Sequence, residues 1–411
     1  YGVFYNHTNR QGREGLLGFN LPFVINADKS ISGSQTLRSS SAIFRLRDGI
    51  PAGLIDIGLI NLSTVARKAQ DMFQRTPYAQ QWNFGIQQGF AMNTALELAY
   101  VGNRGLKLPA FRNLNQAPVV FSSEGVPSAG ARPLAPLGLN GGTIQYLENI
   151  GRSSYHSLQA KVETRLTKRS SIGAAWTWGS ALSDSADHLS TATAGVGVDL
   201  GVFREPQNGY NRRAEYGPAE FDVRHRFVAS GVLEIPVGRG QAYAAHLPRA
   251  LDLLLGGWEL SPIVTAQTGL ALTITQSELL NLGGERRSRP NRLGNGALPP
   301  DRRSVDSWFD TAAFRILQVN PALPGFVPYQ AFGNSGVGIV RAPGLFNVDV
   351  NAAKSIAMSE GRSVQLRAEF FNAFNHTNFG VPGTNIGAGF GQIVNTATEA
   401  RIIQWGLKYR F

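Results

Sequence analysis

One stretch of the 411-residue chain combines the residue types of a serine hydrolase. "SALSDSADH" supplies serines, acids and a histidine between Ser180 and His188, and such an enzyme needs all three within reach of one another. The serines lack the flanking glycines of a nucleophile elbow. Asp184 and Asp187 could hold Ca²⁺ with nearby carbonyls, but their spacing is not that of a calcium loop. We therefore expect no catalytic residue and no calcium site here.

A second candidate is the histidine of "DVRHR", Asp222–Arg226. A zinc site needs several ligands at suitable spacing, whereas the histidines are far apart in sequence: His7, His156, His188, His225, His246 and His376. The chain has no cysteine, which excludes thiolate metal sites, disulfides and cysteine nucleophiles. We expect a hydrogen-bonding role for His225 at a strand end, and no metal, cofactor or enzymatic activity.

The formal net charge of +11 would suit a nucleic-acid-binding protein. However, Lys and Arg are scattered, and the denser groups at Gly284–Arg292 and Asp301–Arg303 lie among Gly, Pro, Ser and Asn. This pattern favours solvated loop charge over a nucleic-acid groove. The excess charge could instead contact lipopolysaccharide or balance acidic residues elsewhere in a longer protein.

The candidate residues lie in or next to segments in which apolar and polar side chains alternate with a period of two. In "SLQAKVETRL" apolar residues alternate with Gln, Lys, Glu and Arg, and "QQWNFGIQQ", "RFVASGVLEIP" and "RSVQLRAEFFN" repeat the pattern. Such segments reach about ten residues, enough to cross a bilayer at a tilt, whereas sandwich strands average about five or six. The longest nearly apolar stretch, Ala52–Leu62, is too short for a membrane helix.

The connections between these segments alternate in length. Long ones cover residues 27–78, 108–153, 182–220, 276–343 and 377–398, and shorter ones cover 90–92, 167–169, 237–254 and 358–361. Transmembrane β-barrels have short periplasmic turns and long extracellular loops, whereas propellers and sandwiches have no reason to sort loops in this way. We therefore predict an all-β fold, an antiparallel transmembrane β-barrel in the bacterial outer membrane.

The alternation assigns two faces to the barrel wall. On the last strand we expect lipid contact, and a role as the barrel-assembly strand, for Ile403, Trp405, Leu407, Tyr409 and Phe411. Polar positions expected to face the lumen are Lys161, Glu163, Arg165, Arg367 and Glu369. These five residues could form a structural ladder of cross-strand ion pairs, which we favour, or a polar wall that contacts a plug or ligand.

Ligand selection is expected in the long loops, above all in 276–343. Its aromatic residues Trp308, Phe309 and Tyr329 could stack on a sugar or peptide, or could pack the loop against itself. We favour packing.

Nine stretches in order resemble one family. They are "RTPYAQQWNFGIQ", "LELAYVGNRG", "NLNQ", "SSYHSLQAKVETRL", "AAWTWGSALSD", "AEFDVRHRFVASGVLEIPVGRG", "LGGWELSPIVTAQTG", "LRAEFFNAFNHTNFG" and "QWGLKYRF". Between Arg75 and Phe411 the chain resembles the C-terminal barrel of Oar-like TonB-dependent receptors. That resemblance implies a 22-stranded outer-membrane barrel with an N-terminal plug, pulled by TonB, and in many members a preceding carboxypeptidase-regulatory-like domain.

Nothing in the sequence looks like a plug, that sandwich domain or a TonB box, and the chain starts at Tyr1 without a basic-then-apolar leader. We therefore expect a fragment or a processed piece with nine strands, plus one or two in Tyr1–Asn26, about half a barrel with unpaired edges.

The resemblance implies active uptake of a large or scarce extracellular ligand. Expected partners are the TonB complex through the missing N-terminal region, the barrel-assembly machinery, lipid and lipopolysaccharide. Two other readings stay open: a passive porin or adhesin-like barrel, and, less favoured, an outer-membrane enzyme.

Overall fold

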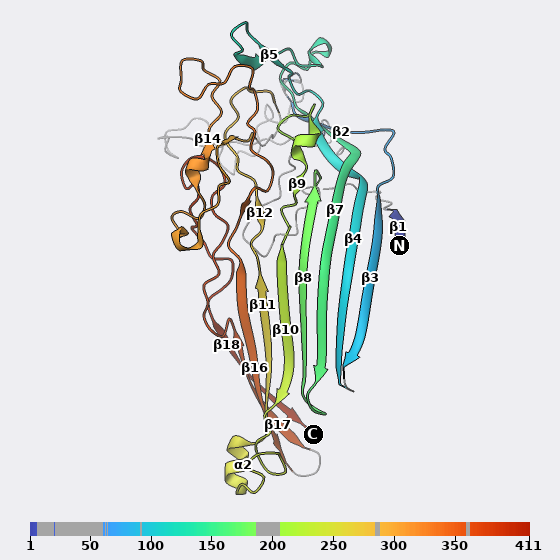
Figure 1. Cartoon of the computed structure of the whole chain (residues 1–411), viewed down its shortest axis with the longest axis vertical. Coiled ribbons are helices and arrows are strands. Elements are labelled where there is room, and N and C mark those ends of the chain that lie inside the picture. The colour runs from blue at the N-terminus through green and yellow to red at the C-terminus, as the bar shows by residue number, and fades with distance from the viewer. Residues whose placement is uncertain are drawn as a thin grey trace, which may run out of the picture.

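A computed structural model describes residues 1–5, 20, 61, 63, 65–90, 93–185, 206–283, 288–358 and 362–411. In this part of the chain one large sheet dominates (Figure 1). Its main path runs through β1 (Gly2–Tyr5), β3 (Tyr78–Phe90), β4 (Thr94–Asn113), β7 (Ile144–Arg165), β8 (Ser171–Ser183), β10 (His225–Glu234), β11 (Trp258–Gln267), β16 (Leu345–Ala357), β17 (Ser363–Phe371) and β18 (Ile402–Arg410).

Each strand on this path pairs antiparallel with the next. Two short strands lie off the path: β2 (Arg67–Gln70) pairs parallel with β7, and β9 (Gly217–Pro218) pairs with β8. Within the described residues the sheet is not closed, since β1 and β18 form its two edges. The predicted antiparallel barrel wall is confirmed, as an open sheet.

No helix in the described part of the chain is both long and apolar enough to cross a membrane.

The alternating sequence sets the register. In the last pair, Leu407 lies opposite Leu366 and Trp405 opposite Ala368, whereas Gln404 lies opposite Glu369. Every apolar position of β18 therefore meets an apolar position of β17 on the same face. A slip of one residue would bring the charged side chains onto the apolar face, so the pattern disfavours registers shifted by an odd number of residues.

The long connections gather at one end of the sheet, which we call the outer end, and the short turns lie at the other, inner end (Figure 1). The strands extend past the predicted loop boundaries at residues 108 and 153. β4 continues to Asn113 and β7 begins at Ile144, so their hairpin extends beyond the rest of the sheet. The register shifts at Leu108, next to Lys107 with its positive φ of 55°. This bulge and the adjacent Pro109 interrupt the alternation, so the sequence pattern does not indicate that the strand continues.

The main hydrophobic core lies in the outer connections and not on the sheet. Phe309 is 1% exposed and its ring meets those of Phe390 and Phe314, with centroids 5.2 and 6.1 Å away. Around it pack Leu272, Ile274, Ala313, Val340 and Ala342. We call this unit, built from residues 270–283, 288–343 and 377–398, the outer loop body.

Short elements order the outer connections. They are the strand pairs β12 (Ala271–Leu272) with β15 (Val340–Arg341), β13 (Asn291–Arg292) with β14 (Phe314–Arg315) and β5 (Val119–Phe121) with β6 (Pro127–Ala129), and the 3₁₀ turns η4 (Ala135–Leu137), η5 (Arg212–Glu215), η6 (Pro300–Arg302) and η7 (Thr311–Ala313).

Buried ion pairs fasten the outer loop body to neighbouring segments. Asp222 is 1% exposed, accepts a hydrogen bond from the backbone N–H of Ala181 at the end of β8, and pairs with Arg341 at 2.6 Å. Arg289, 2% exposed, pairs with Glu215 at 2.6 Å. These contacts join segments more than 70 residues apart, so the long connections form one body.

At the inner end, α2 (Arg249–Leu255) lies in the connection between β10 and β11 (Figure 1). The indole N–H of Trp258 donates to the carbonyl of Leu254 at 2.9 Å, and the ammonium of Lys354 contacts the carbonyl of Gly256. The first contact fixes the helix against the first residue of β11, and the second ties the residue after the helix to β16.

Candidate functional site

One face of the sheet is apolar across its full width. Phe84 lies opposite Tyr100, Tyr100 opposite Leu158, and Leu158 opposite Trp178. At the other edge, Trp405 is 76% exposed. An apolar surface this continuous is rare on a protein surrounded by water, and strands crossing a membrane present such a face to lipid. All five apolar residues predicted for the last strand are exposed, and those within β18 lie on this face.

Aromatic and histidine rings mark the outer edge of the apolar face. Tyr100 hydrogen-bonds the Nδ1 of His156 at 2.7 Å, and Trp82 lies 6.1 Å from the same ring. The ring of His225 stacks with Trp176 and Trp178, with centroids 5.8 and 6.2 Å away. Amphipathic rings are enriched at membrane–water interfaces, so this row belongs at the interface.

The hydrogen bond expected for His225 at the strand end is made by its backbone, whose N–H donates to Thr268 Oγ1 at 3.0 Å. The imidazole itself stacks, which the sequence did not reveal. Within the described residues no three His, Asp or Glu side chains are grouped closely enough to hold a metal ion.

The opposite face carries the five predicted polar residues. Lys161 pairs with Glu163 at 2.7 Å along the same strand, although Glu97 stands opposite it on β4. Arg367 donates from Nε to Gln365 at 2.9 Å, again along one strand.

Cross-strand partners are missing from the rest of this set. Arg367 lies opposite Ala353 and Gly406, and Glu369 lies opposite Asn351 and Gln404. Of these five residues only Lys161 has an opposite charge across the strand pair, so the favoured ladder of cross-strand ion pairs does not form as a continuous row. Their role as a polar wall that meets a plug or ligand stays a prediction.

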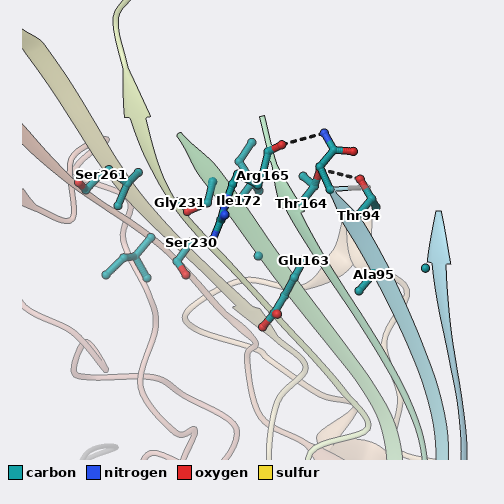
Figure 2. A pocket seen from close by; sticks show the side chains of 15 residues that line it. Thr94, Ala95, Glu163, Thr164, Arg165, Ile172, Ser230, Gly231 and Ser261 are labelled. Carbon is teal, nitrogen blue, oxygen red and sulfur yellow. Dashed lines mark hydrogen bonds between the residues drawn. The ribbon is translucent and has the colours of Figure 1, made fainter. Parts of the chain in front are cut away.

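A cavity of about 860 Å³ opens near the inner ends of β4, β7, β8, β10 and β11 (Figure 2). Its lining includes Ala95, Glu163, Arg165, Ser230 and Ser261. The rim is held by a hydrogen bond between the hydroxyls of Thr94 and Thr164 at 2.8 Å (Figure 2). Small residues and two charged ones make this a wide, wet recess at the inner end of the sheet.

The three loop aromatics have different environments. Phe309 is buried in the outer loop body, so its ring packs the loop and is closed to a ligand. Trp308 is half-buried and donates from Nε1 to the carbonyl of Arg341 at 2.8 Å. Tyr329 is 63% exposed, with its ring 5.6 Å from Phe121 and its hydroxyl bonded to the carbonyl of Ser123. Of the three, Tyr329 is the one open to solvent.

The hydrolase-like stretch is divided between described and undescribed residues. Ser183 donates to the carbonyl of Arg152, and Asp184 accepts the N–H of Arg152 at 2.7 Å, so both serve the hairpin backbone. Asp187 and His188 lie outside the described residues, as does most of 27–78 and all of Tyr1–Asn26 beyond residues 1–5 and 20.

The match to a protein-family model agrees with this geometry. A family model described as "outer membrane beta barrel domain" matches residues 1–404. Similar solved structures include the outer membrane transporter YddB from Escherichia coli, with 9% identity and a TM-score of 0.39 over 84% of this chain. The FrpB iron transporter from Neisseria meningitidis (F3-3 variant) has 11% identity and a TM-score of 0.37 over 83% of this chain.

The alignments cover 34% and 32% of those two transporters, so this chain spans about a third of their length. No curated protein matches the sequence significantly.

Proposed function

The chain belongs to the outer membrane beta barrel domain family, and because it forms part of a barrel wall in the bacterial outer membrane, we propose that it serves TonB-dependent uptake of an extracellular ligand. It is a transporter and not an enzyme in this proposal. Energy would come from the TonB complex through a region of the protein outside these 411 residues.

The observation that carries the proposal is a ten-strand path that does not close within the described residues. Barrels of about eight strands close around a core of side chains, whereas barrels of about 22 strands enclose a lumen that needs a plug. A wall that is still open after ten strands therefore belongs to a wide barrel. Its polar face, with Lys161, Glu163, Arg367 and Glu369, would line that lumen.

The outer loop body supports the ligand-binding part of the proposal. Its connections carry their own core and buried ion pairs, so they present a folded surface at the outer end. Tyr329, exposed and supported by Phe121, offers a ring for stacking on a sugar or peptide. Specificity on loops held by a rigid scaffold is the usual arrangement.

The second candidate is a passive porin or adhesin-like barrel. It would use the same wall and the same apolar face, and a packed loop body would suit an adhesin. The two readings differ in whether the lumen is plugged and whether TonB engages the protein.

The test uses the full-length protein in planar lipid bilayers together with the purified periplasmic domain of TonB. We expect a closed barrel without steady conductance, and capture of the TonB domain that is lost when the segment upstream of Tyr1 is deleted. Steady open-channel conductance of the full-length protein, with no capture of the TonB domain, would favour the porin.

A further inference from the structure

A second cavity, of about 360 Å³, lies at the outer end of the hairpin formed by β4 and β7. Its lining includes two arginines, one histidine and two aromatic residues: Arg104, Arg152, His156, Trp82 and Tyr216, together with Ser154. Arg104 stands opposite Ser154, one step beyond the pair of Gly102 and His156. Alternation therefore places the cluster on the apolar face of the sheet, and not on the polar one.

The cluster lies at headgroup height. Arg104 lies ten positions beyond Thr94, the first residue of β4, and on the same face. At about 3.4 Å per residue and a tilt of about 40°, this is about 26 Å along the membrane normal. The apolar band of such barrels is about 25 Å tall. Arg104 thus sits where hydrocarbon ends, at the long-loop side and therefore in the outer leaflet.

The two guanidinium groups are available to an anion. Arg104 is exposed, and among the described residues its side chain has no hydrogen-bond or ion-pair partner. Arg152 is half exposed and lies over the ring of Tyr216 at 4.5 Å, with Asp184 at 3.7 Å from its Nε. Arg212 shares that carboxylate at 3.6 Å. Arg104, Arg152 and Arg212 thus bring three positive charges to this region and Asp184 brings one negative charge, so the region carries an excess of positive charge.

The walls are held in place by neighbours. The indole of Trp82 lies over Gly102, where a Cβ would meet it at 2.3 Å, so only glycine leaves room for this ring position. The hydroxyl of Tyr216 bonds Ser154 at 2.9 Å, and His156 is held by Tyr100 at 2.7 Å. The pocket thus combines fixed aromatic surfaces, suited to sugar rings, with arginine forks that match phosphate oxygens in pairs.

We propose that this pocket binds the phosphorylated sugar headgroup of an outer-leaflet glycolipid, the chemistry of lipopolysaccharide. Arg104 and Arg152 contact the phosphate, while Trp82 and Tyr216 flank the sugar. The acyl chains then run down the apolar face past Tyr100 and Leu158. The site faces lipid and not the lumen, so it is separate from ligand uptake and stands if the uptake proposal fails.

The test measures binding of bisphosphorylated lipid A to the full-length protein in nanodiscs. For the double variant R104Q/R152Q we expect binding at least about tenfold weaker, since each lost charge-assisted contact contributes substantially. Phosphatidylglycerol and fully dephosphorylated lipid A should each bind more weakly than the bisphosphorylated form. The control is R302Q, which removes the same charge from an exposed loop arginine and should change affinity less than about twofold.

Three results would overturn the proposal: unchanged affinity in R104Q/R152Q, equal affinity for phosphatidylglycerol, or displacement of lipid A by inorganic phosphate at comparable concentration. The first result would show that the arginines do not bind the phosphate. The second would show that the sugar is not recognised, and the third that the lipid is not needed for binding. Should the double variant fail to fold, R104Q alone keeps the test, because this exposed side chain has no partner in the described structure.

Discussion

Asp222→Ala is expected to free the outer loop body from the sheet at a cost of about 3–5 kcal/mol, the usual penalty for breaking one side of a buried ion pair. The carboxylate is 1% exposed and binds Arg341 at 2.6 Å and the N–H of Ala181 at 2.6 Å. Its removal leaves the guanidinium of Arg341, at the end of β15, without its buried counter-charge.

Amide hydrogen exchange at Ala342 measures this change, because its N–H donates to Leu270 within the loop body at 2.9 Å. Protection should fall by roughly 10²–10³-fold, at about 1.4 kcal/mol per factor of ten. Asp306→Ala, at an exposed position in the same loop, is the matched control and should leave protection unchanged. Equal protection in both variants would contradict the role of Asp222.

Phe309→Ala should destabilise the outer loop body by about 3–5 kcal/mol, as expected for a large aromatic side chain removed from a core. Its ring meets Phe390 and Phe314 in edge-to-face contacts, and neighbouring chain cannot collapse fully into the space left behind. The barrel wall should stay folded, since its strand pairing does not involve this residue.

Limited proteolysis of the loops, followed alongside heat-modifiable migration of the barrel, separates these two effects. Loop cleavage should accelerate in Phe309→Ala while the barrel signal stays as in the parent protein. The control is Phe374→Ala, which removes the same ring from a position that is 73% exposed and therefore not part of a core. A cleavage rate in Phe309→Ala no faster than in Phe374→Ala would show that the ring does not hold the loop body together.

Period-two alternation predicted the sheet well because it is a local signal. Each strand of the main path from β3 to β18 lies on a segment where apolar and polar residues alternate, and the register of Leu407 against Leu366 follows from matching faces. The polar positions of Lys161 and Arg367 were also readable, because a side chain's face depends only on its parity.

Contacts between distant segments could not be read in this way. Asp222 and Arg341 are 119 residues apart, and nothing in "DVRHR" marks its aspartate as buried. Phe309 lies in a long loop, and its packing depends on residues 377–398. The ladder prediction failed because parity assigns a face but not the charge of the residue across the pair.

The arginine pocket was missed although the sequence held a signal. Arg104 and Arg152 fall on the apolar parity of β4 and β7, in "VGNRG" and "GRSSYH". Arg104 follows the apolar positions of β4, and Arg152 precedes those of β7. A cation at the end of a lipid-facing row indicates headgroup height, and the bulge at Lys107 obscured how far the strands continue.

The most direct test of the barrel wall uses the absence of cysteine from these 411 residues. Single cysteines at residues 364–370 of β17, spin-labelled in the full-length protein in liposomes, report contact with dissolved oxygen in lipid or with a water-soluble nickel chelate. We predict oxygen access at 364, 366, 368 and 370 and chelate access at 365, 367 and 369, in step with the register of β17 and β18. Equal access to both reagents at successive positions would contradict a wall with one face in lipid and one in water.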